Sequence, residues 1–268
     1  MKLIRLTPEN KALYHSQIVD LEQKAEYPYG DHFFKIDHGK DYFAFFERQG
    51  KLDYYMLVDK NKVAGVVAAV LRDVPSHTGI KKIWYYCDLK IHPDYRGRHL
   101  PIKMAYKIYL RNFLTSWNGF GISMNPASGG HQNRMKKLIR WLRWIPVRTN
   151  TQLNLFSLDK NAMQKAQPIL EQFRGKIRFL SLEGIKDLIL THDQSKIPIL
   201  HAQFGKSEAL NPEQSMPQEG CIHMFCIAAE DPLVSKLAEI QILPFSTMTL
   251  FNYGKNPRDW NWLMTSDL

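Results

Sequence analysis

The chain has 268 residues, of which 44% are hydrophobic and 12% aromatic. This length and composition exclude a disordered chain, and they allow one large domain or two smaller ones with buried cores. The formal net charge of +10 favours acidic partners, such as a phosphorylated cofactor, a nucleic acid or an anionic surface, without choosing among them.

No segment has the features of an export signal or a transmembrane span. The start lacks the apolar region of a signal peptide, and the longest apolar run, residues 63–71, is too short to cross a bilayer. Cys221, His223 and Cys226 resemble metal ligands, but on a strand Cys226 would point away from the other two. We therefore expect buried sulfur, no metal site and a soluble, cytoplasmic protein.

The first third of the chain predicts a strand, helices and a hairpin. Thr7-Pro8-Glu9 is a helix-start signal, and the turn at residues 59–62 joins two apolar runs. Tyr27-Pro28-Tyr29-Gly30-Asp31 favours a loop, whereas residues 42–46 read as the packed core of a helix. The predicted elements are a strand at 3–6, a helix at 8–25, a helix at 42–46, and strands at 54–59 and 63–71.

Residues 83–117 combine an alternating strand, a basic turn and an amphipathic helix. Pro93 ends the strand, and Pro101 begins the helix at a position where a missing N–H costs little. A strand, a basic turn and a helix start in this order can hold an anion. Period-two alternation puts Ile83, Tyr85, Cys87, Leu89 and Ile91 on one face and Trp84, Tyr86, Asp88 and Lys90 on the other. The predicted apolar stripe of the helix is Ile102, Tyr106, Tyr109, Leu110 and Phe113.

The stretch from Asp88 to Arg98, Asp-Leu-Lys-Ile-His-Pro-Asp-Tyr-Arg-Gly-Arg, resembles the GNAT acyltransferase superfamily. The family signature is a strand, a His-Pro-type break and a basic, glycine-containing turn that opens a helix. Its turn holds the pyrophosphate of acyl-coenzyme A with backbone amides. Here His99 and Pro101 stand where the two signature glycines belong, and proline has no amide proton. The other amides of the turn can still donate.

The resemblance implies a set of contacts with the coenzyme. The turn would hold the phosphates, the key strand would meet the thioester carbonyl and the pantetheine, and the second helix would supply an asparagine to the pantetheine arm. The implied residues are Arg96, Gly97, Arg98, His99 and Leu100 in the turn, Leu89, Lys90 and Ile91 on the strand, and Asn133 on the helix.

The rest of the chain alternates between predicted strands and helices. The strands are at 119–124, 151–158, 176–180, 197–204, 221–228 and 246–253, and the helices at 131–144, 161–173, 182–190 and 232–240. The element order through residue 158 is that of the GNAT core, in which two central strands splay apart and coenzyme A enters the gap. We expect an α/β (α+β) fold with a GNAT-like mixed central sheet flanked by helices. Residues 1–158 would form the acyl-CoA-binding core, and residues 159–268 an α/β extension, either continuous with the core or a second GNAT-like lobe.

Acyl transfer to an amine needs a neutral amine, a polarised carbonyl and a proton for the leaving thiolate. Asp88 is the predicted general base, directly or through water; the alternative is a structural Asp paired with Lys90 or an arginine. The family often has a tyrosine acid on the second helix, but residues 139–142 contain none. Tyr27 and Tyr29, in the segment that lines the acceptor side in the family, are the candidate substrate-binding residues and alternative proton donors.

Two classes of function stay open. The first is an N-acyltransferase that uses acetyl-CoA or another acyl-CoA, needs no metal, and acts on an amine of a small molecule in preference to a protein. The second is a GNAT-fold protein that binds a ligand or partner without turnover. Nucleic-acid binding through the basic helix at residues 131–144 is a weaker third reading.

Overall fold

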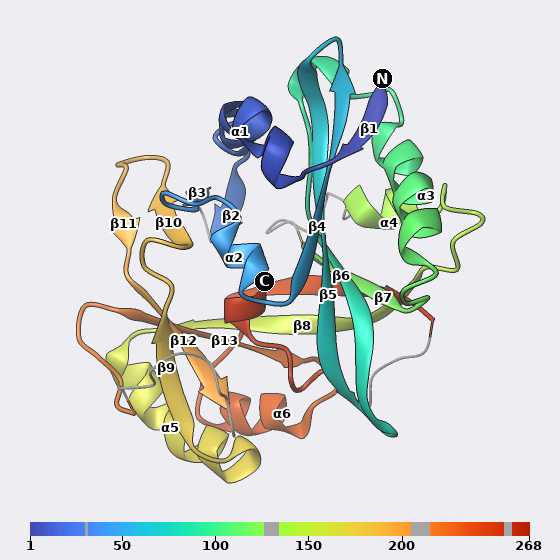
Figure 1. Cartoon of the computed structure of the whole chain (residues 1–268). Helices are drawn as coiled ribbons and strands as arrows, with labels where there is room; N and C mark the ends of the chain where they lie inside the picture. The colour runs from blue at the N-terminus through green and yellow to red at the C-terminus, as the bar shows by residue number, and fades with distance from the viewer. Residues whose placement is uncertain (30–31, 126–133, 205–214, 255–258) are drawn as a thin grey trace.

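The computed structural model describes residues 1–29, 32–125, 134–204, 215–254 and 259–268. Most strands form one ten-stranded sheet, and four short ones form a second sheet (Figure 1). The large sheet has the order β1 (Lys2–Arg5), β4 (Lys51–Asp59), β5 (Lys62–Ser76), β6 (Gly79–Ile91), β7 (Gly119–Met124), β14 (Ser246–Tyr253), β8 (Arg148–Leu158), β13 (Ile222–Ala228), β12 (Ile199–Phe204) and β9 (Ile177–Ser181). The small sheet has the order β11 (Lys196–Ile197), β10 (Asp187–Leu190), β3 (His32–Asp37) and β2 (Tyr27–Tyr29).

Helices flank the large sheet, with α3 on the opposite side of β4–β6 from α1 and α2 (Figure 1). Thr7 caps α1, as its helix-start signal predicts, and Asp159 and Asp231 cap α5 and α6 through their side chains. The helices are α1 (Pro8–Glu22), α2 (Ala44–Glu47), α3 (Leu100–Asn112), α4 (Arg134–Ile139), α5 (Lys160–Arg174) and α6 (Pro232–Glu239). Two 3-10 turns, Pro93–Tyr95 and Thr265–Asp267, complete the described elements.

The large sheet is mixed, as predicted. β6 pairs with β7 and β12 with β13 in parallel, while the other neighbours run antiparallel. The late strand β14 lies between β7 and β8, so the two parts of the chain share one uninterrupted sheet. The boundary at residue 158 stays a prediction.

Two sequence predictions are wrong in detail, and one strand was not predicted. Residues 182–190 do not form a helix: a turn leads into β10, which pairs with β3. The strand β3 itself had no clear alternation and was not predicted. Residues 27–29 are not a loop but the strand β2, in which Tyr27 opposes Phe34 of β3 and stacks on its ring at 5.3 Å. In each case pairing with another strand outweighs the local signal, and for β10 that strand, β3, is distant in the sequence.

A bulge in β6 corrects the predicted faces of that strand. The register against β5 shifts between Val66 and Ala68, and Asp88 has a φ of 56°. Before the bulge, Tyr85 packs into the core with α1 and α2, and Trp84 packs toward α3. Because a bulge adds one unpaired residue, Asp88 and Lys90 share the face of Tyr85, whereas Ile91 joins Trp84.

The buried face of α3 also differs from the predicted stripe. Leu100, Met104 and Ile108 are buried against the sheet. Tyr106 and Tyr109 pack against a small cluster that includes Leu142, which follows α4. Leu110, which belongs to the predicted stripe, is 72% exposed. The helix therefore has two contact faces, and Leu110 lies on neither of them.

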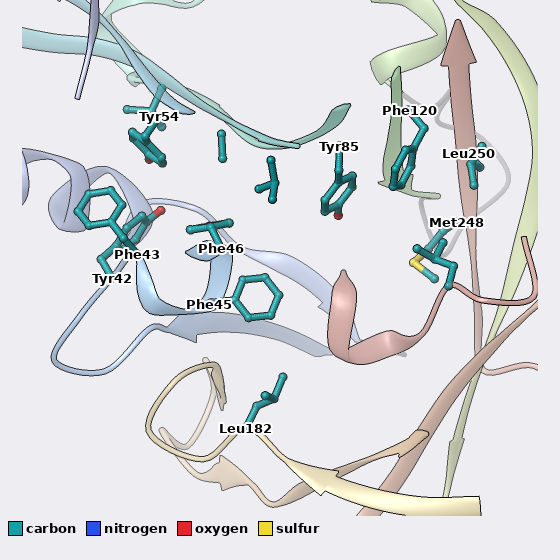
Figure 2. Packing of buried hydrophobic residues seen from close by; sticks show 14 of the residues in the cluster. Tyr42, Phe43, Phe45, Phe46, Tyr54, Tyr85, Phe120, Leu182, Met248 and Leu250 are labelled. Carbon is teal, nitrogen blue, oxygen red and sulfur yellow. The ribbon is translucent and has the colours of Figure 1, made fainter. Parts of the chain in front are cut away.

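The main core lies between the large sheet and α1, α2 and the small sheet. Tyr42, Phe43, Phe45 and Phe46 form an aromatic group at α2, as Figure 2 shows, and confirm the predicted packing of residues 42–46. Phe43 packs edge-on against Tyr54 of β4 at 5.0 Å. Tyr85 stacks on Phe120 of β7 at 4.8 Å. This core holds the Tyr85 face of β6 in place. No helix in the described part of the chain is long and apolar enough to span a membrane.

Candidate active site

The two parallel strands β6 and β7 separate partway along their length. They pair at Trp84 with Gly119, Tyr85 with Phe120 and Tyr86 with Gly121. Beyond Tyr86, β6 pairs with β5 and β7 pairs with β14, but within the described residues β6 and β7 no longer pair with each other. The residues of β6 from Cys87 to Ile91 therefore border a gap, as the predicted splay of two central strands requires.

The turn before α3 presents free backbone amides. Among the residues that the structure describes, the N–H groups of residues 97–100 have no hydrogen-bond acceptor. His99 precedes α3 with a φ of 54°, in the left-handed region that glycine adopts most easily, and Gly97 has a φ of 79°. Pro101 lies in the first turn of α3, where its missing N–H removes no helical bond. Both departures from the family signature are thus compatible with a turn that donates to an anion.

Basic side chains add positive charge to this turn. Arg96 and Arg98 are both exposed, and the guanidinium of Arg98 donates to the carbonyl of Asp94 at 3.2 Å and lies 5.0 Å from the ring centroid of Tyr95. Arg96 has no such contact within the described chain. A helix N-terminus with free amides and two arginines favours a phosphate group.

One cavity of about 1090 Å³ joins the turn to the protein interior. It begins at Arg96, Gly97 and His99, passes between β6 and β7, and continues to the side of α2 and the small sheet. Of the residues predicted to bind coenzyme or substrate, those that line it are Leu89, Lys90, Ile91, Arg96, Gly97, His99 and Tyr27. Arg98 and Leu100 do not line it, and Leu100 is buried in the core under α3. Asn133 and the side chain of Tyr29 lie outside the described residues.

The predicted base Asp88 belongs to a buried charged cluster. The ammonium of Lys90 contacts the carboxylates of both Asp88 and Glu22. Tyr54 donates to Asp88 at 2.6 Å, and the Tyr42 hydroxyl lies 2.9 Å from both Asp88 and Glu22. The two carboxylates expose only 2% of their side chains. The pairing of Asp88 with Lys90, the alternative reading from sequence, is therefore present.

Lys90, Tyr42 and Tyr54 keep their protons around neutral pH, and burial raises the pKa of Glu22. Burial alone would lower the pKa of Lys90, but Asp88, Tyr27 and Glu22 together raise it. Burial raises the pKa of Tyr54 and of Tyr42, so both hydroxyls keep their protons. A carboxylate has about four lone-pair sites. With Lys90, Tyr42 and Tyr54 as donors, Asp88 keeps room to accept from a substrate group, and its role as the base stays a prediction.

Several residues of this site carry no sequence signal. Glu22 occupies a buried position of α1, and Tyr42 and Tyr54 read as ordinary core aromatics. Only the fold brings them to Asp88. Tyr86 and Tyr253 form a second hydroxyl pair on the cavity wall, with their oxygens 2.9 Å apart.

The cysteines play no nucleophilic part in this arrangement. Burial raises the pKa of Cys87, so its thiol stays protonated. Cys226 is buried. His223, which lies between Cys221 and Cys226 in the sequence, accepts a hydrogen bond at its Nε2 atom from the amide of Gln218 at 3.0 Å. Across the described ranges, no group of three His, Cys, Asp or Glu side chains is arranged to hold a metal ion.

Two buried histidines near the cavity predict acid sensitivity. Burial lowers the pKa of His38 to about 4 and that of His201 to about 3. An unfolded histidine titrates near 6.5, so between about pH 6.5 and 4 the unfolded chain binds protons that the folded chain does not. Above pH 6.5 these histidines should not lower the free energy of unfolding. Below pH 6.5 the free energy of unfolding should fall, by up to about 1.4 kcal/mol per pH unit for each histidine.

Urea unfolding at pH 7.5 and pH 5 measures this effect. Because carboxylates titrate in the same range, His38→Gln serves as the comparison: its loss of stability between the two pH values should be smaller than that of the wild type. Equal losses in the two proteins would show that His38 is not buried in its neutral form.

Comparison with known proteins agrees with this geometry. No family model matches the chain. An uncharacterised protein, L340, of Acanthamoeba polyphaga mimivirus is 23% identical over 243 residues, which cover 85% of this chain and 68% of that protein.

Solved structures of the GNAT superfamily share the fold along nearly the whole chain. A tandem GNAT protein from the clavulanic acid biosynthesis pathway matches at a TM-score of 0.51 and 9% identity, over 96% of this chain and 99% of that one. Saccharomyces cerevisiae N-myristoyltransferase with bound myristoyl-CoA matches at a TM-score of 0.51 and 8% identity, over 96% and 79%. A GCN5-related N-acetyltransferase from Anabaena variabilis matches at a TM-score of 0.51 and 11% identity, over 94% and 72%.

The protein has the GNAT fold. The match to a tandem GNAT protein over both halves fits an arrangement in which the second half extends the first as a GNAT-like lobe.

Proposed function

We propose that this protein is an acyl-CoA-dependent N-acyltransferase that transfers an acetyl or other acyl group to an amine of a small molecule. The observation that carries the proposal is the single cavity that leads from the free amides before α3, through the gap between β6 and β7, to the buried cluster around Asp88. These are an anion site, a slot for an extended thiol arm and a proton acceptor, in that order.

Each part of the cavity has a task in this reaction. The amides of residues 97–100 and the side chain of Arg96 bind the pyrophosphate. The edge of β6 at Leu89, Lys90 and Ile91 receives the pantetheine and polarises the thioester carbonyl. Asp88 takes a proton from the amine, directly or through water, and the leaving thiolate takes one from water or from Tyr27.

A small acceptor fits the surroundings of Asp88 better than a protein does. The side chains of Asp88, Glu22 and Lys90 are largely removed from solvent, and the hydroxyls of the buried Tyr42 and Tyr54 lie within hydrogen-bond distance of Asp88. A lysine on a protein surface would have to displace this packing to reach the carboxylate. A free amine can enter the cavity itself.

Binding without turnover is the second candidate, and one observation favours it. Lys90, Tyr42 and Tyr54 already surround the carboxylate of Asp88, as expected for a structural ion pair. Calorimetry with acetyl-CoA and longer acyl-CoAs, followed by transfer assays with a panel of amines, separates the two candidates. Binding without transfer to any amine would favour the second, and no binding of any acyl-CoA would contradict both.

Reversing the charge of the turn should weaken coenzyme binding. The double variant Arg96→Glu/Arg98→Glu replaces two attractive charges with repulsive ones, and we expect the Kd of acetyl-CoA to rise about tenfold or more, since hydrogen bonds to charged groups contribute about 1.5–3 kcal/mol each. Isothermal titration calorimetry gives the value.

The matched control is Lys165→Glu/Lys176→Glu. These two lysines are exposed at α5 and just after it, at the other end of the large sheet (Figure 1), and carry the same change in charge. If both double variants weaken binding equally, only the net charge matters, and the turn is not the phosphate site.

A further inference from the structure

Lys186 places an unpaired ammonium on the inner wall of the cavity. It lies just before β10 and lines the cavity on the side of α2, where its Nζ atom is 4.4 Å from the ring centroid of Phe45. Within the described ranges, no carboxylate lies at ion-pair distance from it. On the same hairpin, Lys196 pairs with both Glu183 and Asp187.

The ammonium of Lys186 lacks the carboxylate partner that usually stabilises a charge inside a protein. Burial lowers the pKa of Lys186 to about 8. Cys87 and the carboxylate of Glu22 act against this lowering, and the positive charges of Arg48 and Lys90 add to it. A charge removed from water is stable only with a partner or a hydrogen-bonding ligand. The cation–π contact with Phe45 supplies a small part of this, since it contributes about 0.5–2 kcal/mol. An anion in the cavity would supply the rest.

The Nδ1 atom of His38 is a second polar atom that lacks a hydrogen-bond partner in the described chain, and the His38 ring lies 5.8 Å from that of Phe45. The side chain of His38 is 5% exposed. The charges of both Asp88 and Lys186 act on it, which places the imidazole within electrostatic reach of both groups. With a pKa of about 4, the ring is neutral and can accept or donate one hydrogen bond to a ligand.

The cavity wall also carries a carboxylate. Asp88 lines the cavity together with Lys90, whereas Glu22, which contacts Lys90 as well, does not line it. Packed rings connect Asp88 with Lys186: the His38 ring lies 4.7 Å from Tyr42, whose hydroxyl is 2.9 Å from Asp88, and 5.8 Å from Phe45, which contacts the ammonium of Lys186. A molecule that carries both an ammonium and a carboxylate is complementary to these two groups.

The remaining wall is apolar. The side chains that line it on this side of the sheet are Phe34, Ile36, Phe45, Phe46, Leu188 and Met224. Burial of a hydrophobic side chain against such a surface contributes about 25 cal/mol per Å². An acceptor with an apolar body of moderate size would gain this energy, whereas a very polar amine would not.

We propose that the acceptor is an amino acid with an apolar side chain, bound with its carboxylate on Lys186 and its amino group toward Asp88. This inference rests on the proposed function. After the ammonium has lost a proton to Asp88, directly or through water, its neutral nitrogen attacks the thioester carbon. The C–N bond forms, the C–S bond breaks, the nitrogen gives up a second proton to water, and the leaving thiolate takes one up. The products are an N-acyl amino acid and free coenzyme A, and the carboxylate stays on Lys186 throughout.

The test compares matched acceptors on the wild type and on Lys186→Met. Phenylalanine, phenylalaninamide and phenethylamine share one aromatic body and differ in the carboxylate. We expect the wild type to prefer phenylalanine about tenfold to a hundredfold in kcat/KM, the range of a hydrogen bond to a charged group. In Lys186→Met the KM of phenylalanine should rise until this preference disappears, while the KM of acetyl-CoA stays unchanged.

Lys196→Met removes a paired lysine from the same hairpin and should leave the preference intact. Calorimetric titration of phenylalanine in the presence of coenzyme A gives a second readout, and binding should be lost only in Lys186→Met. A Tm of Lys186→Met at or above that of the wild type shows that the variant is folded and that the ammonium stabilises a ligand, not the fold.

Three results would overturn the assignment. The first is an unchanged preference in Lys186→Met. The second is a preference of the wild type for succinyl-CoA over butyryl-CoA that Lys186→Met abolishes. Lys186 would then bind a carboxylate on the acyl group and not on the acceptor. The third is a mass increase on Lys186 itself after incubation with acetyl-CoA. If acetyl-CoA does not bind at all, the proposed function fails first; if it binds and is transferred to amines regardless of a carboxylate, only this inference fails.

Discussion

Asp88→Asn is expected to cut the rate of acyl transfer about a hundredfold or more while acetyl-CoA still binds. The asparagine keeps the shape of the side chain but cannot accept a proton from the amine, and general base catalysis contributes about 10²–10⁴-fold. The carboxylate lies at the bulge of β6, on the wall of the cavity, with Lys90, Tyr42 and Tyr54 already in place around it. Its change should therefore act on kcat, and single-turnover kinetics with saturating acetyl-CoA measures the effect.

Asp94→Asn is the matched control, because Asp94 is an exposed carboxylate between the same strand and the same turn, does not line the cavity, and pairs with Lys62 and His92. It should change the rate little. Because the neutral side chain also removes a partner of Lys90, circular dichroism and the Tm of Asp88→Asn must be close to the wild type for the rate to be interpreted. A folded Asp88→Asn variant with an undiminished rate would assign Asp88 to the structure and not to the chemistry.

A chain that ends at Asp159 is expected not to fold cooperatively. The truncation removes β14, whose strand pairs with β7 on one side and β8 on the other, and also β13, the other neighbour of β8. Without them β8 loses both of its partners and β7 exposes an unpaired apolar edge, which favours aggregation. We expect an insoluble chain or one without a cooperative melting transition in calorimetry.

A single substitution in β14 should destabilise the protein less than the truncation does. Leu250 is fully buried at the centre of that strand, and Leu250→Ala should lower the free energy of unfolding by about 2–5 kcal/mol without loss of cooperativity. Thr247→Ala, which changes a partly exposed position of the same strand, should lower the free energy of unfolding much less.

A truncated chain that is monomeric and melts cooperatively would show that the first 159 residues are a domain in their own right.

The sequence was most informative where the local pattern and the tertiary environment agree. The hairpin of β4 and β5, the strand Gly119–Met124 and the strand Ser246–Tyr253 have clear apolar runs and turn residues, and their positions are close to those predicted. The basic turn before α3 was also visible, since it consists of consecutive residues. Such features are encoded within a few positions of the chain.

The rest depends on contacts between distant residues. The bulge at Asp88 reverses the faces of β6 and cannot be read from an alternation that looks regular in the sequence. Glu22, Tyr42 and Tyr54 reach Asp88 only because α1, α2 and β4 pack together. Lys186 had no signal at all: it was predicted to lie in a helix, and its importance comes from the cavity that it faces.

The place of β14 in the sheet also determines the order in which the protein can assemble. The strand β7 is made before its antiparallel neighbour β14, and the strands β8 to β13 lie between them in the sequence. Loop closure over so long a stretch is slow, and folding rates fall as contacts become less local. During translation the edge of β7 therefore stays unpaired until β14 has been made, and in this interval it can pair with other chains.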